Sequence, residues 1–370
     1  MMTILHVAPQ LRAGGTMQMA ADLACALQQR GDCHNIVVSP ANELVSKLIA
    51  TGAEHRLCRR FNLLNTVAEL HRLRGLIRSI KPAIIQVYGA DAAAAATLAC
   101  RGLKEHRPIV IGVLTAYPRH GSSYIFRKCC DAFITISKHL RQTAINGVFK
   151  QHRKELMLIP YGVNERQCFP AFSLTADKLE QWRAAHPVAA NHLTLCLPGA
   201  ISPLHGLEDL APILSTLLHQ GIPTHAFIAG DTRKADPLYT EQLKAKFAAA
   251  NLTEHISWIG ARPDLREVLC ACDITLSLTR KPATYDRPVL EALSLGRPVV
   301  GYDHGVVGEL LETFLPEGRV APGDYAAVAD TLIQWHTYRP TPISEIPYPY
   351  RISDTAESCY KLYESLIGMP

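Results

Sequence analysis

Short apolar runs alternate with helical segments along most of the chain. The apolar runs are four to eight residues long, as buried parallel strands are, and in the first half they include Thr3–Val7, Ile36–Ser39, Ala83–Tyr88 and Ile109–Leu114. Between them, segments such as Thr16–Arg30 repeat apolar residues at helical spacing, and a glycine follows that segment. The pattern predicts an α/β protein built on doubly wound parallel sheets.

The alternation is interrupted once, in residues 164–191, where no strand pattern occurs. Leu193–Pro198 restarts it, and further apolar runs follow at 223–230, 256–259, 274–278 and 298–302. Such a break between two alternating series is typical of a domain boundary. We therefore expect two Rossmann-like domains, with the boundary at 165/166 and the second domain ending near 351.

Composition agrees with a soluble, cytoplasmic globular protein of two domains. The 370 residues are 48% hydrophobic and 19% charged, and the net charge of +5 does not by itself indicate nucleic acid. No apolar run approaches the roughly 20 residues that span a bilayer, and Met1–Val7 is expected to be a strand and not a signal peptide. The eleven cysteines lack metal-ligand spacing, so we expect reduced packing residues and no metal site.

The segment 55–81 is rich in basic residues. It carries Arg56, Arg59, Arg60, Arg72, Arg74, Arg78 and Lys81, against Glu54 and Glu69 nearby. One interpretation is a solvated helix whose apolar stripe packs on the sheet. The other is a basic face resting on an anionic membrane, to which each basic residue contributes about 1 kcal/mol.

Two loops have the pattern of anion-binding connections. Gly14 and Gly15 follow the first strand and precede a helix, so a phosphate or sugar can approach the backbone closely. The stretch Thr279–Glu309 passes from a strand through a polar loop into a helix at Pro288–Leu295, then through a second strand into a glycine-bearing turn. Open α/β sheets bind ligands at such carboxyl ends of strands. Glu291, one turn inside that helix, is placed to accept hydrogen bonds from ligand hydroxyls.

The stretch Thr279–Glu309 resembles the retaining glycosyltransferases of the GT-B fold, particularly family 4. Their pattern is Pro-Glu-x-Phe-Gly-x-x-x-x-Glu-Ala, a strand ending in Pro-Val-Val, and a Gly-Gly-x-x-Glu turn. Here Glu291 matches the second glutamate, whereas Ala283 replaces the first glutamate and Asp286 the glycine. The resemblance extends over essentially the whole chain.

The resemblance implies two Rossmann-like domains facing across a cleft. The domain 1–165, completed by a C-terminal helix at 352–370 that crosses back to it, would bind the acceptor, and the domain 166–351 would bind a nucleotide-sugar donor. The reaction would retain anomeric configuration and need no metal or other cofactor. The run Gly301–Gly305 looks like bacterial members that build lipopolysaccharide core or other surface glycans. The acceptor would then be a glycan or lipid-linked, and the protein peripheral on the inner face of the cytoplasmic membrane.

The resemblance also implies a set of site residues. Glu291 is the first catalytic candidate, and Tyr117 or His120 would approach the donor sugar; the pattern does not choose between these two. Arg262 is expected to stack on the nucleobase, and the backbone of the glycine-bearing turn to receive donor oxygens. The donor-binding candidates together are Gly14, Gly15, His205, Arg262, Arg280, Lys281, Arg287, Gly305, Val306, Val307, Gly308 and Glu309.

The donor diphosphate clamp departs from the family pattern. The family's arginine and lysine are here Ala200 and His205; the histidine is charged only below roughly pH 6.5. Arg280, Lys281 and Arg287 are expected to supply the missing charge. The alternatives to an active transferase are a catalytically impaired homologue acting as a binding or scaffold subunit, and a sugar-nucleotide epimerase on the same fold.

Overall fold

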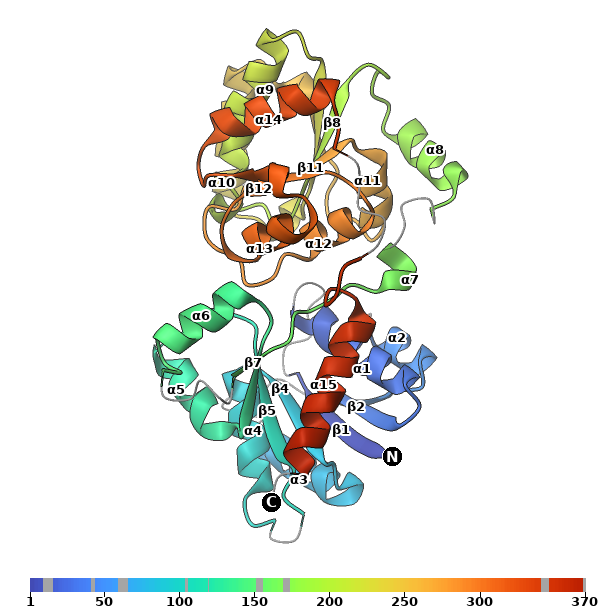
Figure 1. Cartoon of the computed structure of the whole chain (residues 1–370), viewed down its shortest axis with the longest axis vertical. Helices are drawn as coiled ribbons and strands as arrows, with labels where there is room; N and C mark the ends of the chain where they lie inside the picture. Colours follow the sequence, from blue (N-terminus) through green and yellow to red (C-terminus); the bar gives the residue numbers. More distant parts are fainter. Residues whose placement is uncertain are drawn as a thin grey trace. The chain divides into compact units, whose positions relative to one another are not determined.

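The protein consists of two compact units, each built around its own parallel sheet (Figure 1). The computed structural model describes residues 1–8, 16–40, 44–58, 66–103, 106–118, 120–150, 156–168, 174–340 and 346–368. Unit 1 comprises Met1–Asn164 and Tyr348–Pro370, and unit 2 comprises Glu165–Pro347. The predicted pair of doubly wound α/β sheets is confirmed.

Unit 1 has a seven-stranded sheet in the order β3-β2-β1-β4-β5-β6-β7, with every pair parallel. Its strands are β1 (Met2–Val7), β2 (Cys33–Ser39), β3 (Glu54–Leu57), β4 (Ile84–Tyr88), β5 (Ile109–Leu114), β6 (Ala132–Thr135) and β7 (Leu156–Leu158). The strand order reverses between β1 and β4, which is the switch point where α/β sheets open a ligand crevice.

The helices of unit 1 are packed in two groups. They are α1 (Thr16–Gln29), α2 (Leu44–Ala50), α3 (Thr66–Ile80), α4 (Ala90–Cys100), α5 (His120–Cys129), α6 (Lys138–Asn146) and the C-terminal α15 (Ile352–Ile367). Helix α1 packs against α2 and α15, whereas α4 packs against α3 and α5. Helix α4 buries Ala92, Ala93 and Ala96, whose small side chains permit close helix packing.

Helix α15 returns the chain to unit 1, as the sequence predicted (Figure 1). The Ile352 N–H donates to the Val163 carbonyl over 2.8 Å, and the Gly162 N–H donates to Thr355 Oγ1 over 2.9 Å. Tyr363 on the same helix is fully buried and donates to Gln86 of β4. These bonds satisfy buried polar groups where the last helix meets the sheet.

Unit 2 has a six-stranded parallel sheet in the order β10-β9-β8-β11-β12-β13. Its strands are β8 (Leu193–Pro198), β9 (Thr224–Ala229), β10 (Ile256–Trp258), β11 (Ile274–Ser277), β12 (Val299–Tyr302) and β13 (Arg319–Val320). Its α-helices are α7 (Glu165–Cys168), α8 (Ala176–Ala185), α9 (Leu210–His219), α10 (Pro237–Ala249), α11 (Leu265–Ala271), α12 (Arg287–Ser294), α13 (Gly305–Phe314) and α14 (Tyr325–Thr337). This is the strand order of dinucleotide-binding folds, with the switch point between β8 and β11.

Three local elements differ from the sequence-based expectation. Strand β3 lies inside the basic segment and pairs in parallel with β2 at the sheet edge, a long-range contact that periodicity does not reveal. Helix α5 begins at His120, within the expected loop 115–124. The expected turn 303–308 already contains the first turn of α13, because Gly305 begins that helix. Among the described residues, no helix is long and apolar enough to cross a bilayer.

Candidate functional site

Three neighbouring connections meet at the carboxyl edge of the unit 2 sheet. They join β8 to α9 (199–209), β11 to α12 (278–286) and β12 to α13 (303–304). Glycines allow their backbones to touch: a side chain at Gly206 would clash with the Leu278 carbonyl, and one at Gly305 would come within 2.6 Å of the Ala283 carbonyl oxygen. Both glycines also have positive φ angles, of 65° and 56°. The three connections therefore form one continuous wall beside the switch point.

Glu291 lies on α12, where the sequence predicted it, but its carboxylate is already paired. Its relative exposure is only 5%. Arg287, one turn earlier, donates from Nε to Glu291 Oε1 over 2.8 Å, and the Cys168 thiol of α7 lies 3.9 Å from the same oxygen. Within the described part of the chain, Oε2 has no hydrogen-bond partner. Arg287, predicted as a donor cation, is thus paired with Glu291 in this structure.

Asp286 fixes the start of α12, a role that sequence analysis missed. It accepts a hydrogen bond from the Val289 N–H over 3.1 Å and one from Ser277 Oγ over 3.2 Å. Burial raises the pKa of this carboxyl group. An aspartate one residue before Arg287-Pro288 is an N-cap pattern, so the signal was present in the sequence. The residue that departs from the family's glycine is therefore a helix cap.

The first turn of α13 offers fewer free amides than expected. The Val306 N–H donates to the Ala283 carbonyl over 2.9 Å, and the Gly308 N–H donates to the His304 carbonyl over 3.2 Å. The Gly305 and Val307 N–H groups have no partner among the residues that the structure describes. Of the four predicted amides, two donate inside the protein, and the other two belong to the buried residues Gly305 and Val307. Glu309, on the next turn, is half-buried and engaged within the fold.

The arginines offered as donor cations are bound to carboxylates. Arg262 forms a two-bond fork with Asp264, with N–O distances of 2.8 and 2.6 Å. Arg280 donates to Asp209 over 2.6 Å and also lies 3.6 Å from Glu208. Lys281 is exposed and, over the described ranges, has no ion-pair partner. Lys281 is therefore the candidate that keeps an available positive charge.

The clamp positions carry no fixed positive charge. Ala200 is exposed, and His205 lies in a short 3₁₀ turn (Pro203–His205) with its Nδ1 2.8 Å from Ser202 Oγ. Burial lowers the pKa of His205 from its ordinary value, so the imidazole is neutral near pH 7. It can take part in one hydrogen bond through Nε2 but does not replace a lysine.

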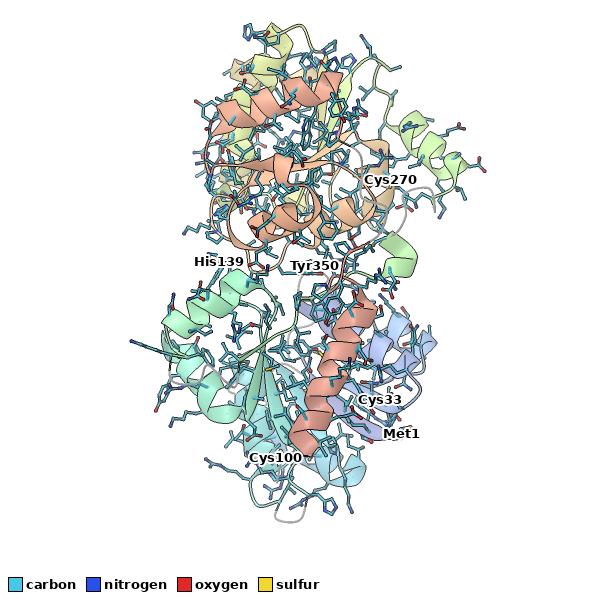
Figure 2. The ribbon with its side chains drawn as sticks, in the orientation of Figure 1. Met1, Cys33, Cys100, His139, Cys270 and Tyr350 are labelled. Atoms are coloured by element: carbon cyan, nitrogen blue, oxygen red, sulfur yellow. The ribbon has the colours of Figure 1, made fainter. Side chains whose placement is uncertain are left out.

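In unit 1, Tyr117 lies in the loop after β5 and pairs with His139 of α6; Figure 2 labels His139. Its hydroxyl is 2.9 Å from His139 Nδ1, and the rings meet edge to face at 5.5 Å. His139 was not singled out from the sequence, although it lies directly after the Ser137-Lys138 helix entry. His120 begins α5, but its side chain, like Gly14 and Gly15, lies outside the described residues.

Metal-ligating residues do not gather in the part of the chain that the structure describes. No group of three or more histidine, cysteine, aspartate or glutamate side chains is arranged to hold an ion there.

Comparison with known proteins identifies the two halves of the chain. Residues 13–167 match the family model Glycosyltransferase Family 4, and residues 192–337 match the model Glycosyl transferases group 1. No curated protein sequence matches the chain at a significant level.

Solved glycosyltransferases share the fold over the whole chain. A glycosyltransferase from Rickettsia africae ESF-5 is 20% identical, with a TM-score of 0.85 and coverage of 100% of this chain and 99% of that one. HepE of Anabaena, solved with UDP and glucose, is 18% identical, with a TM-score of 0.81 and coverage of 99% and 100%. The lipopolysaccharide outer core galactosyltransferase WaaB is 13% identical, with a TM-score of 0.68 and coverage of 99% of both chains.

The two family matches cover most of unit 1 and most of unit 2, and the architecture is that of the solved enzymes. Together they establish that the chain is a glycosyltransferase of the GT-B fold.

Proposed function

We propose that this glycosyltransferase moves a sugar from a nucleotide-sugar donor to an acceptor hydroxyl with retention of configuration, in the synthesis of lipopolysaccharide core or another surface glycan. The HepE structures with UDP and UDP-glucose support a nucleotide donor. WaaB and WaaG, a glycosyltransferase involved in lipopolysaccharide biosynthesis, support the class of product.

The observation that carries the proposal is the grouping of donor-binding chemistry at the start of α13. The N–H groups of Gly305 and Val307 donate to no described residue and lie, on buried residues, at the positive end of a helix dipole, where anions bind. Lys281 belongs to the loop whose Ala283 carbonyl fixes that helix start. These groups are the proposed contacts to the donor phosphates.

Glu291 supplies the complementary contact to donor hydroxyls. Its free Oε2 accepts from the ribose or sugar, while Arg287 holds Oε1 and keeps the side chain in place. As the bond between the sugar and the phosphate breaks, negative charge develops on the phosphate, and the α13 amides and Lys281 stabilise that charge. The acceptor oxygen forms the new glycosidic bond, and its proton leaves with the phosphate.

A binding or scaffold subunit without catalysis is the second candidate. It is favoured by Ala200, Ala283 and the neutral His205, because two charge-assisted phosphate contacts and one carboxylate of the family pattern are missing. Charge-assisted hydrogen bonds are the strong ones, at about 1.5–3 kcal/mol each, so the loss of two removes on the order of several kcal/mol of transition-state stabilisation.

The acceptor is proposed to be a glycan or a lipid-linked saccharide, reached by a peripheral contact of unit 1 with anionic lipid. In the basic segment, Arg56 pairs with Glu54 and Arg72 pairs with Glu69, while Arg59 and Arg60 lie outside the described residues. Three further basic residues have no ion-pair partner within the described ranges: Arg74, Arg78 and Lys81. Arg78 and Lys81 are exposed, so the proposed lipid contact depends mainly on the end of α3.

Thermal-shift binding of nucleoside mono- and diphosphates and their sugars tests the proposed function. A ligand at a hundredfold excess over its Kd adds about 2.7 kcal/mol of stability. Glu291→Gln keeps the side-chain shape but removes the charge. The loss of a charged hydrogen bond, which contributes about 1.5–3 kcal/mol, should lower the affinity for the same nucleotide sugar roughly ten- to a hundredfold. Glu312→Gln, an exposed change on α13, is the matched control and leaves binding unchanged.

The outcomes separate the candidates. Stabilisation by one nucleotide sugar that Glu291→Gln weakens and Glu312→Gln preserves supports the transferase and names its donor. Stabilisation by a monophosphate alone supports a donor that lacks the diphosphate. No stabilisation by any nucleotide at millimolar concentration rejects the transferase in favour of the binding subunit.

A further inference from the structure

Side chains from two of the connections at the unit 2 edge and from the end of β12 join a single hydrogen-bonded cluster. Asp209 ends the β8–α9 connection, Arg280 lies in the β11–α12 connection, and Tyr302 is the last residue of β12. Arg280 Nη2 donates to Asp209 Oδ1 over 2.6 Å, and the Tyr302 hydroxyl donates to Asp209 Oδ2 over 2.7 Å. We call Asp209, Arg280 and Tyr302 the edge triad.

Two of the three side chains of the edge triad are buried. Asp209 is 8% exposed and Tyr302 is fully buried. Each oxygen of the Asp209 carboxylate has its own donor, so the buried charge is matched by hydrogen bonds. Burial raises the pKa of the Tyr302 phenol, so the hydroxyl stays protonated and remains a donor throughout the physiological range.

Backbone bonds around the edge triad run between the same connections. The Arg280 N–H donates to the Leu204 carbonyl over 2.8 Å. His304 Nε2 lies 2.6 Å from the Thr279 carbonyl, to which it donates. With the Val306 bond to Ala283, these contacts fix the loop that carries Lys281 against both α9 and α13.

Arg280 has two carboxylate neighbours. Asp209 and Glu208 both lie within ion-pair distance of its guanidinium, at 2.6 and 3.6 Å. Two carboxylates around one arginine leave this cluster with net negative charge, which opposes a diphosphate. The arginine therefore joins the β11–α12 connection to the end of the β8–α9 connection.

We propose that the edge triad consists of positioning residues, which hold Lys281 and the first turn of α13 in the geometry that receives donor phosphate. The inference rests on the proposed function for its ligand, but the hydrogen bonds of the edge triad are a property of unit 2 alone. In a site whose clamp positions are Ala200 and His205, pre-set loop geometry takes the place of two flexible cationic side chains.

Hydrogen exchange and nucleotide binding on the full chain test the proposal together. The variants are Tyr302→Phe, Asp209→Asn, Arg280→Gln and the conservative Arg280→Lys. Arg107→Gln is the matched control, because it removes an exposed arginine–aspartate pair of similar length, 2.8 Å, in unit 1. Exchange is followed at the amides of 279–286 and 304–308, and the probes are UDP and uridine, which share a nucleoside but not the phosphates.

We expect the first three variants to speed exchange in both segments about tenfold and to weaken UDP about tenfold, with uridine affinity unchanged. Arg280→Lys should restore part of the UDP affinity, and Arg107→Gln should leave both segments and both ligands as in the wild type. Unchanged exchange in all three variants would show that the edge triad does not hold these two segments. Equal losses for UDP and uridine overturn the positioning role, because they indicate general damage. Binding of neither ligand to the wild type contradicts a uridine-nucleotide donor, whereas faster exchange in the variants would still support the structural role of the edge triad.

Discussion

Lys281 differs from the arginines around it because its ammonium group is exposed and, in the described parts of the chain, unpaired. Arg262, Arg280 and Arg287 bind Asp264, Asp209 and Glu291, and these pairings decide their roles more than their positions in the sequence do. A lysine is a compact point charge that suits phosphate, whereas a planar guanidinium matches a carboxylate. Residue type therefore gave the candidates, and local pairing separated them.

His6 gives a pH-dependent prediction at the same scale. It is fully buried on β1, with Nε2 3.2 Å from Asn35 Oδ1, and burial lowers the pKa of its imidazole to about 4. The folded state therefore favours the neutral ring. The contribution of the neutral His6 ring to the stability of the folded state is fully present above the unfolded pKa of about 6.5. It is lost as pH falls from about 6.5 to about 4.

Urea unfolding at pH 7, 5.5 and 4.5 measures this effect. The contribution is at most about 3 kcal/mol, from the difference between pKa values of about 6.5 and about 4. His6→Gln keeps an amide able to bond Asn35 and removes the titration, so the free energy of unfolding of the variant should fall less over this range. His225, whose pKa burial also lowers to about 4, is present in both proteins and cancels in the comparison. Parallel curves for the two proteins would contradict the assignment.

Helix α12 illustrates the element scale, because a cap, a proline and a strand end together place Glu291. Asp286 accepts from the Val289 N–H, Pro288 occupies the first turn, and Ser277 at the end of β11 bonds the same aspartate. The helix is only eight residues long, too short to be stable alone, so its cap and its packing hold it in place. The direction of Glu291 depends on that cap.

Asp286→Ala should lower the free energy of unfolding by about 1 kcal/mol through loss of the N-cap. It should also weaken nucleotide-sugar binding, because the first turn of α12 orients Arg287 and Glu291. Asp324→Ala is the control: it removes a similar cap, a 2.9 Å bond to the Ala327 N–H of α14. Chemical unfolding and ligand titration of both variants are the measurements. Equal ligand affinity for Asp286→Ala and Asp324→Ala would refute the link between the cap and the site.

At the scale of the whole molecule, the two units share one strand plan and differ in surface chemistry. Both sheets reverse their strand order beside the first strand of the unit. Unit 2 concentrates paired charges at its carboxyl edge, whereas unit 1 exposes unpaired basic residues at the end of α3. This difference in surface charge motivates the two partners that we propose, a nucleotide sugar for unit 2 and a surface bearing the acceptor for unit 1.

Vesicle sedimentation tests the lipid contact of unit 1. Arg78→Glu with Lys81→Glu should reduce binding to vesicles containing phosphatidylglycerol by at least tenfold, since each basic residue near the surface contributes about 1 kcal/mol. Lys244→Glu with Lys246→Glu on α10 of unit 2 makes the same change in charge and serves as control. Binding should weaken with added salt and be absent on neutral vesicles. Equal binding by the two double variants would reject the α3 surface.

The sequence by itself determined most of the fold. Most of the strands that the structure describes, and the helices between them, follow from short apolar runs and 3.6-residue periodicity, and β8 has the bounds that its apolar run predicts. The exception at the sheet edge, β3, carries the polar sequence Glu54–Leu57 and exists because β2 offers it a parallel partner. Local residue patterns predict a strand where its side chains must be apolar because they are buried. They do not predict a polar edge strand, which forms because a strand distant in sequence supplies its hydrogen bonds.

For the site, the candidate residues could be chosen from the sequence. Only the tertiary structure shows which of their groups are already hydrogen-bonded or ion-paired inside the protein. Glu291, Lys281 and the glycines of 305–308 stand out from the sequence because their types and spacing suit a phosphate-bearing ligand. Which amides are free, which arginines are paired, and that Asp209, Arg280 and Tyr302 meet all depend on contacts between connections far apart in the chain. A hydrogen bond depends on distance and direction, and only the packed sheet brings the carboxyl ends of β8, β11 and β12 to one edge.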